Sequence, residues 1–233
     1  MNFSEYLLKD KKGLKKKIFV NKDYTYLQLF KDVNLISKSL KKFKRQLISI
    51  SFDNSYEFIV YYLAIIKSNN IALILEKGLP LNRHLEIIEK YKVNIFFTDF
   101  FIDKDNFNKN YEIVPEIFKL DGKKIYKISK KKKFEKKINK KYFYDVCLIL
   151  FTSGSSGKKK GVMLTNKNLI SNTNSIIDSL PIKKKDVVNL VLPLSYSFGL
   201  SVLLRLSHKY FAAFELLTKS ICKCPSSVGS KSE

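Results

Sequence analysis

Short apolar segments alternate with helical segments over the first hundred residues of the chain. Apolar side chains recur at three- and four-residue intervals from Leu27 to Phe43, with lysines between them, which predicts an amphipathic helix. Predicted strands cover residues 46–52, 71–75 and 93–98, and predicted helices run through 56–66 and 81–91. This alternation predicts an α/β fold built on a mostly parallel, doubly wound sheet with flanking helices.

The pattern loosens after Asp99 and becomes regular again at Tyr144. The intervening segment is rich in Lys and Asn and holds short apolar pieces at 113–120 and 125–128, which we interpret as edge strands and surface loops. Residues 144–151 form a continuous apolar run typical of a strand buried on both faces. A helix is predicted over 166–177, and Asp53 or Asn54 is expected to cap the helix that follows it.

Charge and cysteine content limit the functional classes. The formal net charge of the 233 residues is +23, which raises the alternative of a non-catalytic protein that binds nucleic acid or another polyanion. Arginine occurs only at positions 45, 83 and 205, although specific phosphate and base recognition usually recruits it, so nucleic acid is not the expected partner. Three cysteines and two histidines give no zinc-binding pattern, and no metal-ligating residue is predicted.

No segment has the pattern of a membrane span or a secretion signal. The longest apolar stretch, 190–204, is interrupted by Pro193 and Gly199 and is shorter than the ~20 residues that cross a bilayer. The first residues lack a charged start followed by an apolar core. We therefore expect a cytoplasmic protein without a membrane partner.

A glycine- and serine-rich segment follows the apolar run at 144–151. It reads Thr152-Ser153-Gly154-Ser155-Ser156-Gly157-Lys158-Lys159-Lys160-Gly161-Val162 and precedes the helix predicted from residue 166. Exposed backbone N–H groups, hydroxyls and ammonium groups together suit a polyphosphate. The Walker A pattern is excluded because position 159 is lysine. A flexible linker is the alternative, but a buried strand that runs into the segment favours a binding loop.

Residues 150–157 together with 160–165 resemble the signature loop of the AMP-binding, adenylate-forming enzymes, which include acyl-CoA synthetases, luciferases and nonribosomal-peptide adenylation domains. Lys159 stands where that family usually has proline. Three further stretches resemble family segments in the expected order, namely 24–29, 62–75 and 192–200. The resemblance covers roughly residues 18–204 and implies the incomplete N-terminal domain of the adenylate-forming fold.

The resemblance implies a reaction and a set of site residues. A carboxylic acid would be activated with ATP and Mg²⁺ to an acyl-adenylate, and coenzyme A or a carrier protein would accept the acyl group. The residues implied for ATP are Thr152, Ser153, Gly154, Ser155, Ser156, Gly157, Lys158 and Lys160, with Lys160 also implied in catalysis through charge stabilisation. Those implied for the acyl pocket are Tyr196, Phe198 and Gly199.

The family's later segments, which would supply adenine, ribose and catalytic-lysine contacts, find no match in residues 205–233. We expect a partial AMP-binding domain over 1–204, an atypical tail over 205–233 that is out of frame with the original gene, and no lysine-bearing C-terminal domain. The parent activity is that of a ligase, and we expect the chain to be inactive alone. A split ligase, in which a second chain supplies the remainder, is a further alternative.

Overall fold

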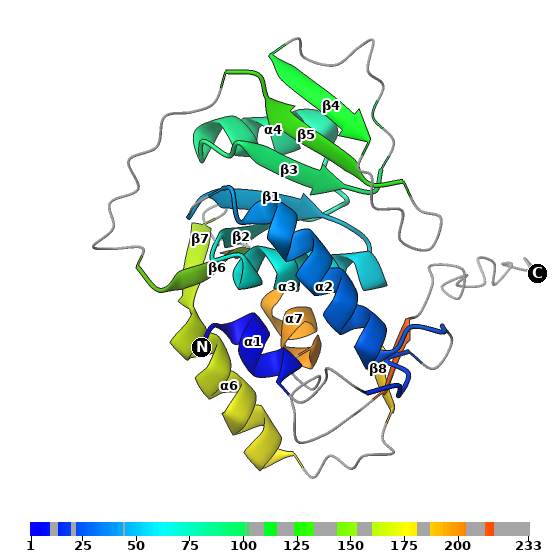
Figure 1. Ribbon diagram of the computed structural model, residues 1–233. Coiled ribbons are helices and arrows are strands. Elements are labelled where there is room, and N and C mark those ends of the chain that lie inside the picture. The colour runs from blue at the N-terminus through cyan, green and yellow to red at the C-terminus, as the bar shows by residue number, and fades with distance from the viewer. Residues whose placement is uncertain are drawn as a thin grey trace, which may run out of the picture.

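The computed structural model describes residues 1–9, 14–19, 22–43, 45–100, 102, 110–115, 124–132, 144–152, 160–180, 187–203 and 213–216. Its main element is a seven-stranded sheet in the order β4-β5-β3-β1-β2-β6-β7 (Figure 1). The strands are β1 (Leu47–Ser51), β2 (Ile71–Ile74), β3 (Ile95–Thr98), β4 (Tyr111–Pro115), β5 (Tyr126–Lys130), β6 (Val146–Thr152) and β7 (Lys160–Thr165).

Four central strands are parallel, because β1 pairs in parallel with β2 and β3, and β2 pairs in parallel with β6. The antiparallel strands β4 and β5 extend one edge and β7 forms the other. The predicted α/β class is confirmed, and the sheet is mixed, with three parallel and three antiparallel pairings. The segment between residues 99 and 144 does supply edge strands, as its loose apolar pattern indicated.

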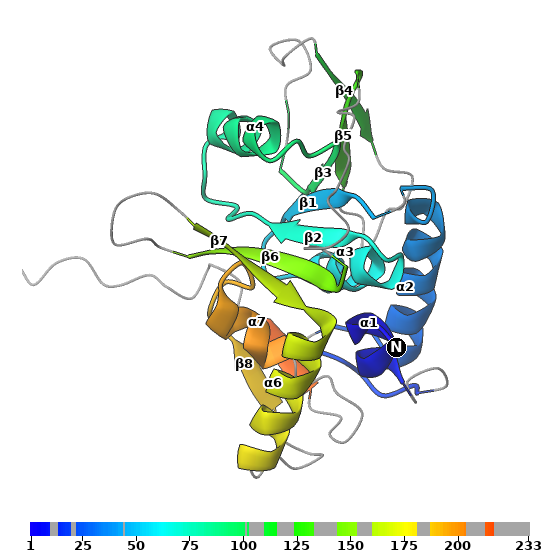
Figure 2. The same cartoon turned by 90° about the vertical axis from the view of Figure 1, so that its left-hand side faces the viewer.

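Helices cover both faces of the sheet. Helix α3 (Tyr56–Lys67) connects β1 to β2, and α4 (Leu81–Lys90) connects β2 back across β1 to β3. Since right-handed crossovers that step in opposite directions put their helices on opposite faces, α3 and α4 lie on different sides of the sheet (Figure 2). This is the doubly wound arrangement, and α2 (Tyr26–Leu40) packs on α3 as a second layer.

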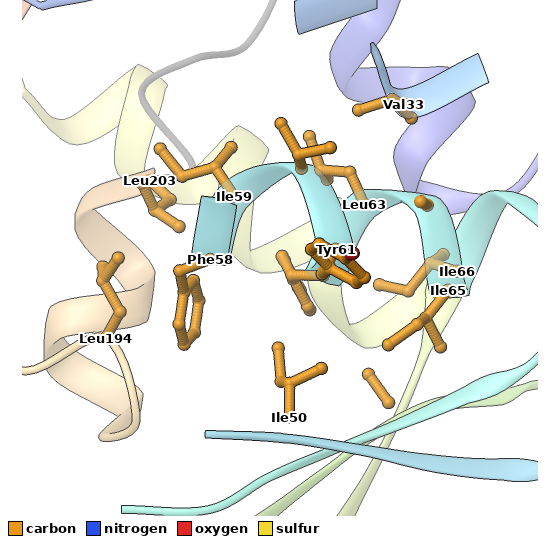
Figure 3. Close-up of a cluster of buried hydrophobic side chains, with 14 of the residues drawn as sticks. Val33, Ile50, Phe58, Ile59, Tyr61, Leu63, Ile65, Ile66, Leu194 and Leu203 are labelled. Carbon is orange, nitrogen blue, oxygen red and sulfur yellow. The ribbon is translucent and has the colours of Figure 1, made fainter. Parts of the chain in front are cut away.

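The core is divided between the two faces by the alternation of side chains along each strand. In β1, Ile48 and Ile50 belong to the cluster under α2 and α3, whereas Leu47 belongs to the cluster under α4. Helix α3 is buried along nearly its whole length, from Tyr56 to Ile66. Figure 3 shows why, since its side chains meet Ile50 of the sheet, Val33 of α2, and Leu194 and Leu203 near the chain's far end.

The predicted N-cap of α3 is wrong. Ser55, not Asp53 or Asn54, accepts the backbone N–H of Phe58. Asp53 instead pairs with Lys77. Asn54 holds a distant segment, because its Nδ2 donates to the carbonyls of Leu190 and Leu192 at 3.2 and 2.9 Å. Its Oδ1 accepts the N–H of Leu194 at 2.9 Å, so the amide fixes residues 190–194 beside the end of β1.

The remaining elements gather on the α3 side of the sheet. They are α1 (Phe3–Leu8), α6 (Asn166–Ser179), α7 (Ser197–Leu203) and a two-stranded parallel sheet of β8 (Val187–Leu190) and β9 (Ala213–Leu216). Helix α1 is fixed on α6 by hydrogen bonds from Phe3 N–H to Asn166 and from Tyr6 Oη to Asn174, at 2.8 and 2.6 Å. Strand β9 lies within residues 205–233, the range assigned from sequence to an atypical tail, and pairs in register with β8.

Among the helices that the structure describes, none combines the length and the apolar character needed to cross a bilayer.

Candidate functional site

The glycine-rich segment lies between two strands of one antiparallel hairpin. β6 ends at Thr152 and β7 starts at Lys160, and these two residues are Cα partners in the register. The expected site residues Ser153, Gly154, Ser155, Ser156, Gly157 and Lys158 lie outside the described residues. One expectation is corrected here, because Lys160, Gly161 and Val162 belong to a strand and not to the loop.

Backbone and side-chain contacts join β6 and β7, the stem of the hairpin, at the end where the glycine-rich segment connects them. The hydroxyl of Thr152 donates to the carbonyl of Lys160 at 3.4 Å, and both side chains are exposed. A Cβ added to Gly161 would lie 3.3 Å from Ile149 Cγ2, tighter than ordinary contact, so the absence of a side chain lets the Ile149 side chain of β6 lie close to the β7 backbone. Phe151 packs edge-on against Tyr91 after α4, with ring centroids 5.4 Å apart, which anchors the stem to the rest of the sheet.

A small cavity of about 40 Å³ adjoins this stem at the carboxyl edge of the parallel strands. Its lining includes Thr152 and Phe151 from β6, Glu76 after β2, and Ser195 and Tyr196. Partial burial and a hydrogen bond to the Glu76 carboxylate raise the pKa of Tyr196, so its hydroxyl stays protonated. The cavity therefore brings together Thr152, which is expected at the phosphate site, and Tyr196, which is expected in the acyl pocket.

The other two expected pocket residues lie differently. Phe198 is 68% exposed, more than Tyr196 at 40%, and does not line the cavity. Gly199 is buried within α7, and a Cβ placed on it would come within 2.2 Å of the Pro193 carbonyl oxygen. Its contact with the backbone of residues 192–193 is enough to explain why this position is glycine, without a role in binding.

An ion cluster at the same sheet edge was not found from sequence. Lys77, which follows β2, forms ion pairs with Asp53 after β1 and with Asp99 after β3. Its Nζ lies 3.0 Å from Asp99 Oδ1. Partial burial lowers the pKa of Lys77, but the two carboxylates outweigh it and the pKa is raised. The signal in the sequence was a charged residue just after each of three parallel strands, since those ends meet at one edge.

A buried histidine supports the loop that follows Lys77. His84 is fully buried, its Nε2 lies 3.0 Å from the Glu76 carbonyl and 3.2 Å from Ser51 Oγ, and its Nδ1 lies 3.2 Å from the Pro80 carbonyl. These contacts hold the connection between β2 and α4, which includes the cavity residues Glu76 and Leu79.

No group of three or more His, Cys, Asp or Glu side chains suited to a metal ion occurs among the residues that the structure describes. Cys147 is buried within β6, and its desolvation, with a smaller contribution from Asp145, raises the pKa of its thiol to about 12. A thiol held protonated in this way is not a nucleophile at neutral pH.

The fold and the hairpin together define an open α/β protein, a class in which ligands bind beyond the carboxyl ends of the central strands. The family model described as "AMP-binding enzyme" matches residues 9–208. The chain belongs to this family of AMP-binding, adenylate-forming enzymes, as the resemblance in its sequence indicated.

Curated relatives include two synthases of Bacillus species. Bacitracin synthase 2 of Bacillus licheniformis is 25% identical over 186 residues, which are 77% of this chain and 6% of that protein. Zwittermicin A synthase ZmaJ of Bacillus cereus is 28% identical over 190 residues, which are 79% of this chain and 34% of that protein. The matched region thus spans 6% and 34% of these two relatives.

Solved structures share the fold at lower identity. The o-succinylbenzoate CoA synthetase MenE of Bacillus subtilis, in complex with an acyl-adenylate intermediate, has a TM-score of 0.68 and 19% identity, covering 91% of this chain and 55% of that one. ATP-bound MatB of Rhodopseudomonas palustris has a TM-score of 0.66 and 18% identity, covering 93% of this chain and 45% of that one. The described fold therefore matches about half of each adenylate-forming enzyme.

Proposed function

We propose that this chain forms the phosphate-binding part of an ATP-dependent ligase that activates a carboxylic acid as an acyl-adenylate and passes the acyl group to a thiol. Family membership over residues 9–208 supports the reaction class. The observation that carries the proposal is the pairing of Thr152 with Lys160, which closes the glycine-rich segment at the carboxyl edge of the sheet. The acceptor would be coenzyme A or a carrier-protein thiol.

The residues in and beside the hairpin fit a polyphosphate. The proposed ATP-binding residues are Thr152, Ser153, Gly154, Ser155, Ser156, Gly157, Lys158 and Lys160. Hydroxyls and backbone N–H groups would donate to the β- and γ-phosphate oxygens, and the two lysines would offset negative charge as pyrophosphate leaves. Lys160 is exposed at the first position of β7, where its ammonium group can reach a phosphate beyond the strand ends.

Mg²⁺ would accompany ATP, chiefly through phosphate oxygens and water, as it does where few carboxylates are available. When bound, it would neutralise part of the phosphate charge. The Ser and Thr hydroxyls of the segment are chemically compatible with this, and no protein ligand for the ion is assigned.

Tyr196 is proposed to line the acyl pocket, because it shares a cavity with Thr152. Its hydroxyl donates its one proton to the Glu76 carboxylate, so the side chain would present its aromatic face toward the carboxylic acid. We keep Phe198 and Gly199 in the proposed pocket segment, with Gly199 acting through the backbone contact that places α7.

Neutralising Lys158 or Lys160 tests the phosphate site. Lys158→Gln and Lys160→Gln should each weaken MgATP binding about tenfold, the loss of one charge-assisted contact. Isothermal titration calorimetry at constant ionic strength measures the change. Lys159→Gln is the matched control, since this lysine is not assigned to phosphate, and it should change the dissociation constant less than about threefold. An equal loss in all three variants would mean that bulk charge governs binding.

The proposed domain boundary is moved from residue 204 to beyond Leu216, because β9 pairs with β8. We propose that the later residues are an atypical tail and that residues 1–233 alone do not supply the adenine, ribose and catalytic-lysine contacts that adenylation needs. A polypeptide of these 233 residues should then bind MgATP yet show no substrate-dependent ATP–pyrophosphate exchange above background.

Exchange assays with fatty, aryl and amino acids test this prediction. Exchange that depends on one acid would show that the polypeptide completes adenylation. Exchange that appears only after addition of a separately expressed downstream reading frame would support the split ligase. We assign the protein to the cytoplasm within this proposal, where ATP is available, and the polyanion-binding alternative is not favoured because the family match extends through most of the chain.

A further inference from the structure

A second and larger cavity lies at the opposite end of the parallel strands from the hairpin. Its volume is about 370 Å³, within the range of small-molecule sites, against about 40 Å³ for the cavity beside Thr152. Gln46 precedes β1 and Asn94 precedes β3, so the cavity opens at the amino ends of the parallel strands. At ~3.3 Å per residue, the five residues of β1 separate the two edges by roughly 15 Å.

The hollow exists because helices cover this face of the sheet unevenly. Ile95 of β3 pairs with Ser129 of β5, and Lys127 lies on the same face of β5 as Ser129. Helix α3 packs on β1 and β2, and α2 packs on α3 (Figure 1). In the described part of the chain, no helix packs on β5 to the same extent. The end of α2, followed by Lys42 and Phe43, therefore forms one wall and β5 forms the other.

The charged groups that line the cavity are all cationic. They are Lys42, Lys127 and Lys130. Lys130 is already compensated, because its ammonium group lies 2.8 and 2.7 Å from the two carboxylate oxygens of Glu89. The carbonyls at the end of α2 contribute a partial negative charge of about one half near Lys42. Lys42 and Lys127 still leave the cavity positive.

Neutral groups add hydrogen-bonding capacity and an apolar floor. Asn94 is only 6% exposed and its Nδ2 donates to Gln46 Oε1 at 3.4 Å, a long contact that a ligand oxygen could improve. Ser129 adds a hydroxyl. Ile95 is buried at the base, and the ring of Phe43 lies beneath the Lys42 ammonium, 5.2 Å from its centroid. Lysine is abundant in this chain, and here lysine side chains share one cavity with two amides and an aromatic ring.

We propose that this cavity binds a small anion carrying a phosphate or carboxylate next to a flat apolar group, at a site separate from the proposed ATP site. Lys42 and Lys127 hold the anionic group, the Asn94 and Gln46 amides orient it, and Phe43 with Ile95 contacts the apolar part. Binding here is independent of the hairpin at the other edge of the sheet.

Phenyl phosphate is the probe, titrated into ¹⁵N-labelled protein and followed by amide chemical shifts. We expect the largest shifts at the side-chain amides of Asn94 and Gln46, and a dissociation constant at least tenfold higher in Lys42→Gln/Lys127→Gln. The control is Lys31→Gln/Lys38→Gln, which removes the same charge from exposed positions of α2 and should bind as the unmodified protein does. Inorganic phosphate and benzyl alcohol, each lacking one half of the probe, should bind more weakly.

Equal weakening in both double variants, or shifts spread evenly over lysine-rich segments, would overturn the proposal in favour of unspecific charge. A short single-stranded oligonucleotide that shifts the same amides more tightly than phenyl phosphate would also overturn it, in favour of nucleic acid. Saturating MgATP should leave phenyl phosphate binding unchanged. Displacement by MgATP would mean that the two sites are one, whereas failure of MgATP to bind at all bears only on the proposed function.

Discussion

Replacing Gly199 by alanine should lower the free energy of unfolding by about 3 kcal/mol, and replacing it by valine should lower it further. The added Cβ would lie 2.2 Å from the carbonyl oxygen of Pro193 and 2.9 Å from that of Leu192. These are backbone atoms, so relief requires α7 to move away from the 192–194 segment. Leu194, Leu200 and Leu203, each nearly fully buried, would then lose part of their contact with α3.

Urea unfolding followed by circular dichroism measures this loss, with the midpoint and slope compared between variants. Ser201→Ala is the control on the same helix, because Ser201 is partly exposed and its hydroxyl only bonds the Phe198 carbonyl. It should change stability by less than about 0.5 kcal/mol. If Gly199→Ala were as stable as the control, the packing of α7 on residues 192–193 would be refuted.

Removing the Lys77 ammonium should cost about 2 kcal/mol. Lys77→Met leaves Asp99, whose side chain is 5% exposed, without its cation. Loss of one partner of a fully buried pair costs about 3–5 kcal/mol, and the value here is reduced because Lys77 and Asp53 are partly exposed. Lys77→Met/Asp99→Asn should recover most of the loss, since the unpaired charge is then gone.

The control is Lys17→Met, which breaks the exposed pair between Lys17 and Asp23 and should cost less than about 0.5 kcal/mol. The pH dependence has a definite sign. Because the folded pKa of Lys77 is raised above its ordinary value of 10.5, its contribution is complete below that pH and is lost as pH rises through the folded value. Equal cost for Lys17→Met and Lys77→Met would contradict a stabilising role for the cluster.

Periodicity predicted the elements whose burial is regular. Eight elements were expected close to their observed positions, namely α2, β1, α3, β2, α4, β3, β6 and α6. β7 was missed because Lys160 to Met163 are exposed at the sheet edge, so no apolar alternation marks the strand. The caps expected at Asp53 and Asn54 failed for a tertiary reason, since both side chains bind segments distant in sequence.

Only part of the candidate site could be predicted from the sequence. Thr152, Lys160 and Tyr196 were expected through the family resemblance, and Tyr196 does line the same cavity as Thr152. Glu76 and Lys77 were not expected, because their partners follow other strands and come near only when the strand order is known. A motif within one segment identifies a loop, whereas contacts among several strand ends depend on topology.

Because β6 and β7 pair in antiparallel fashion, the glycine-rich segment between them can be replaced without changing the strands that flank it. Its ends are joined in register at Thr152 and Lys160, and the strands that flank it pair along their length. A short turn could replace residues 153–159 without altering the order of the sheet. Mutations that weaken the proposed nucleotide contacts could thus accumulate in this segment while β6 and β7 stay paired, so a descendant of this chain could keep its architecture long after losing its ligand.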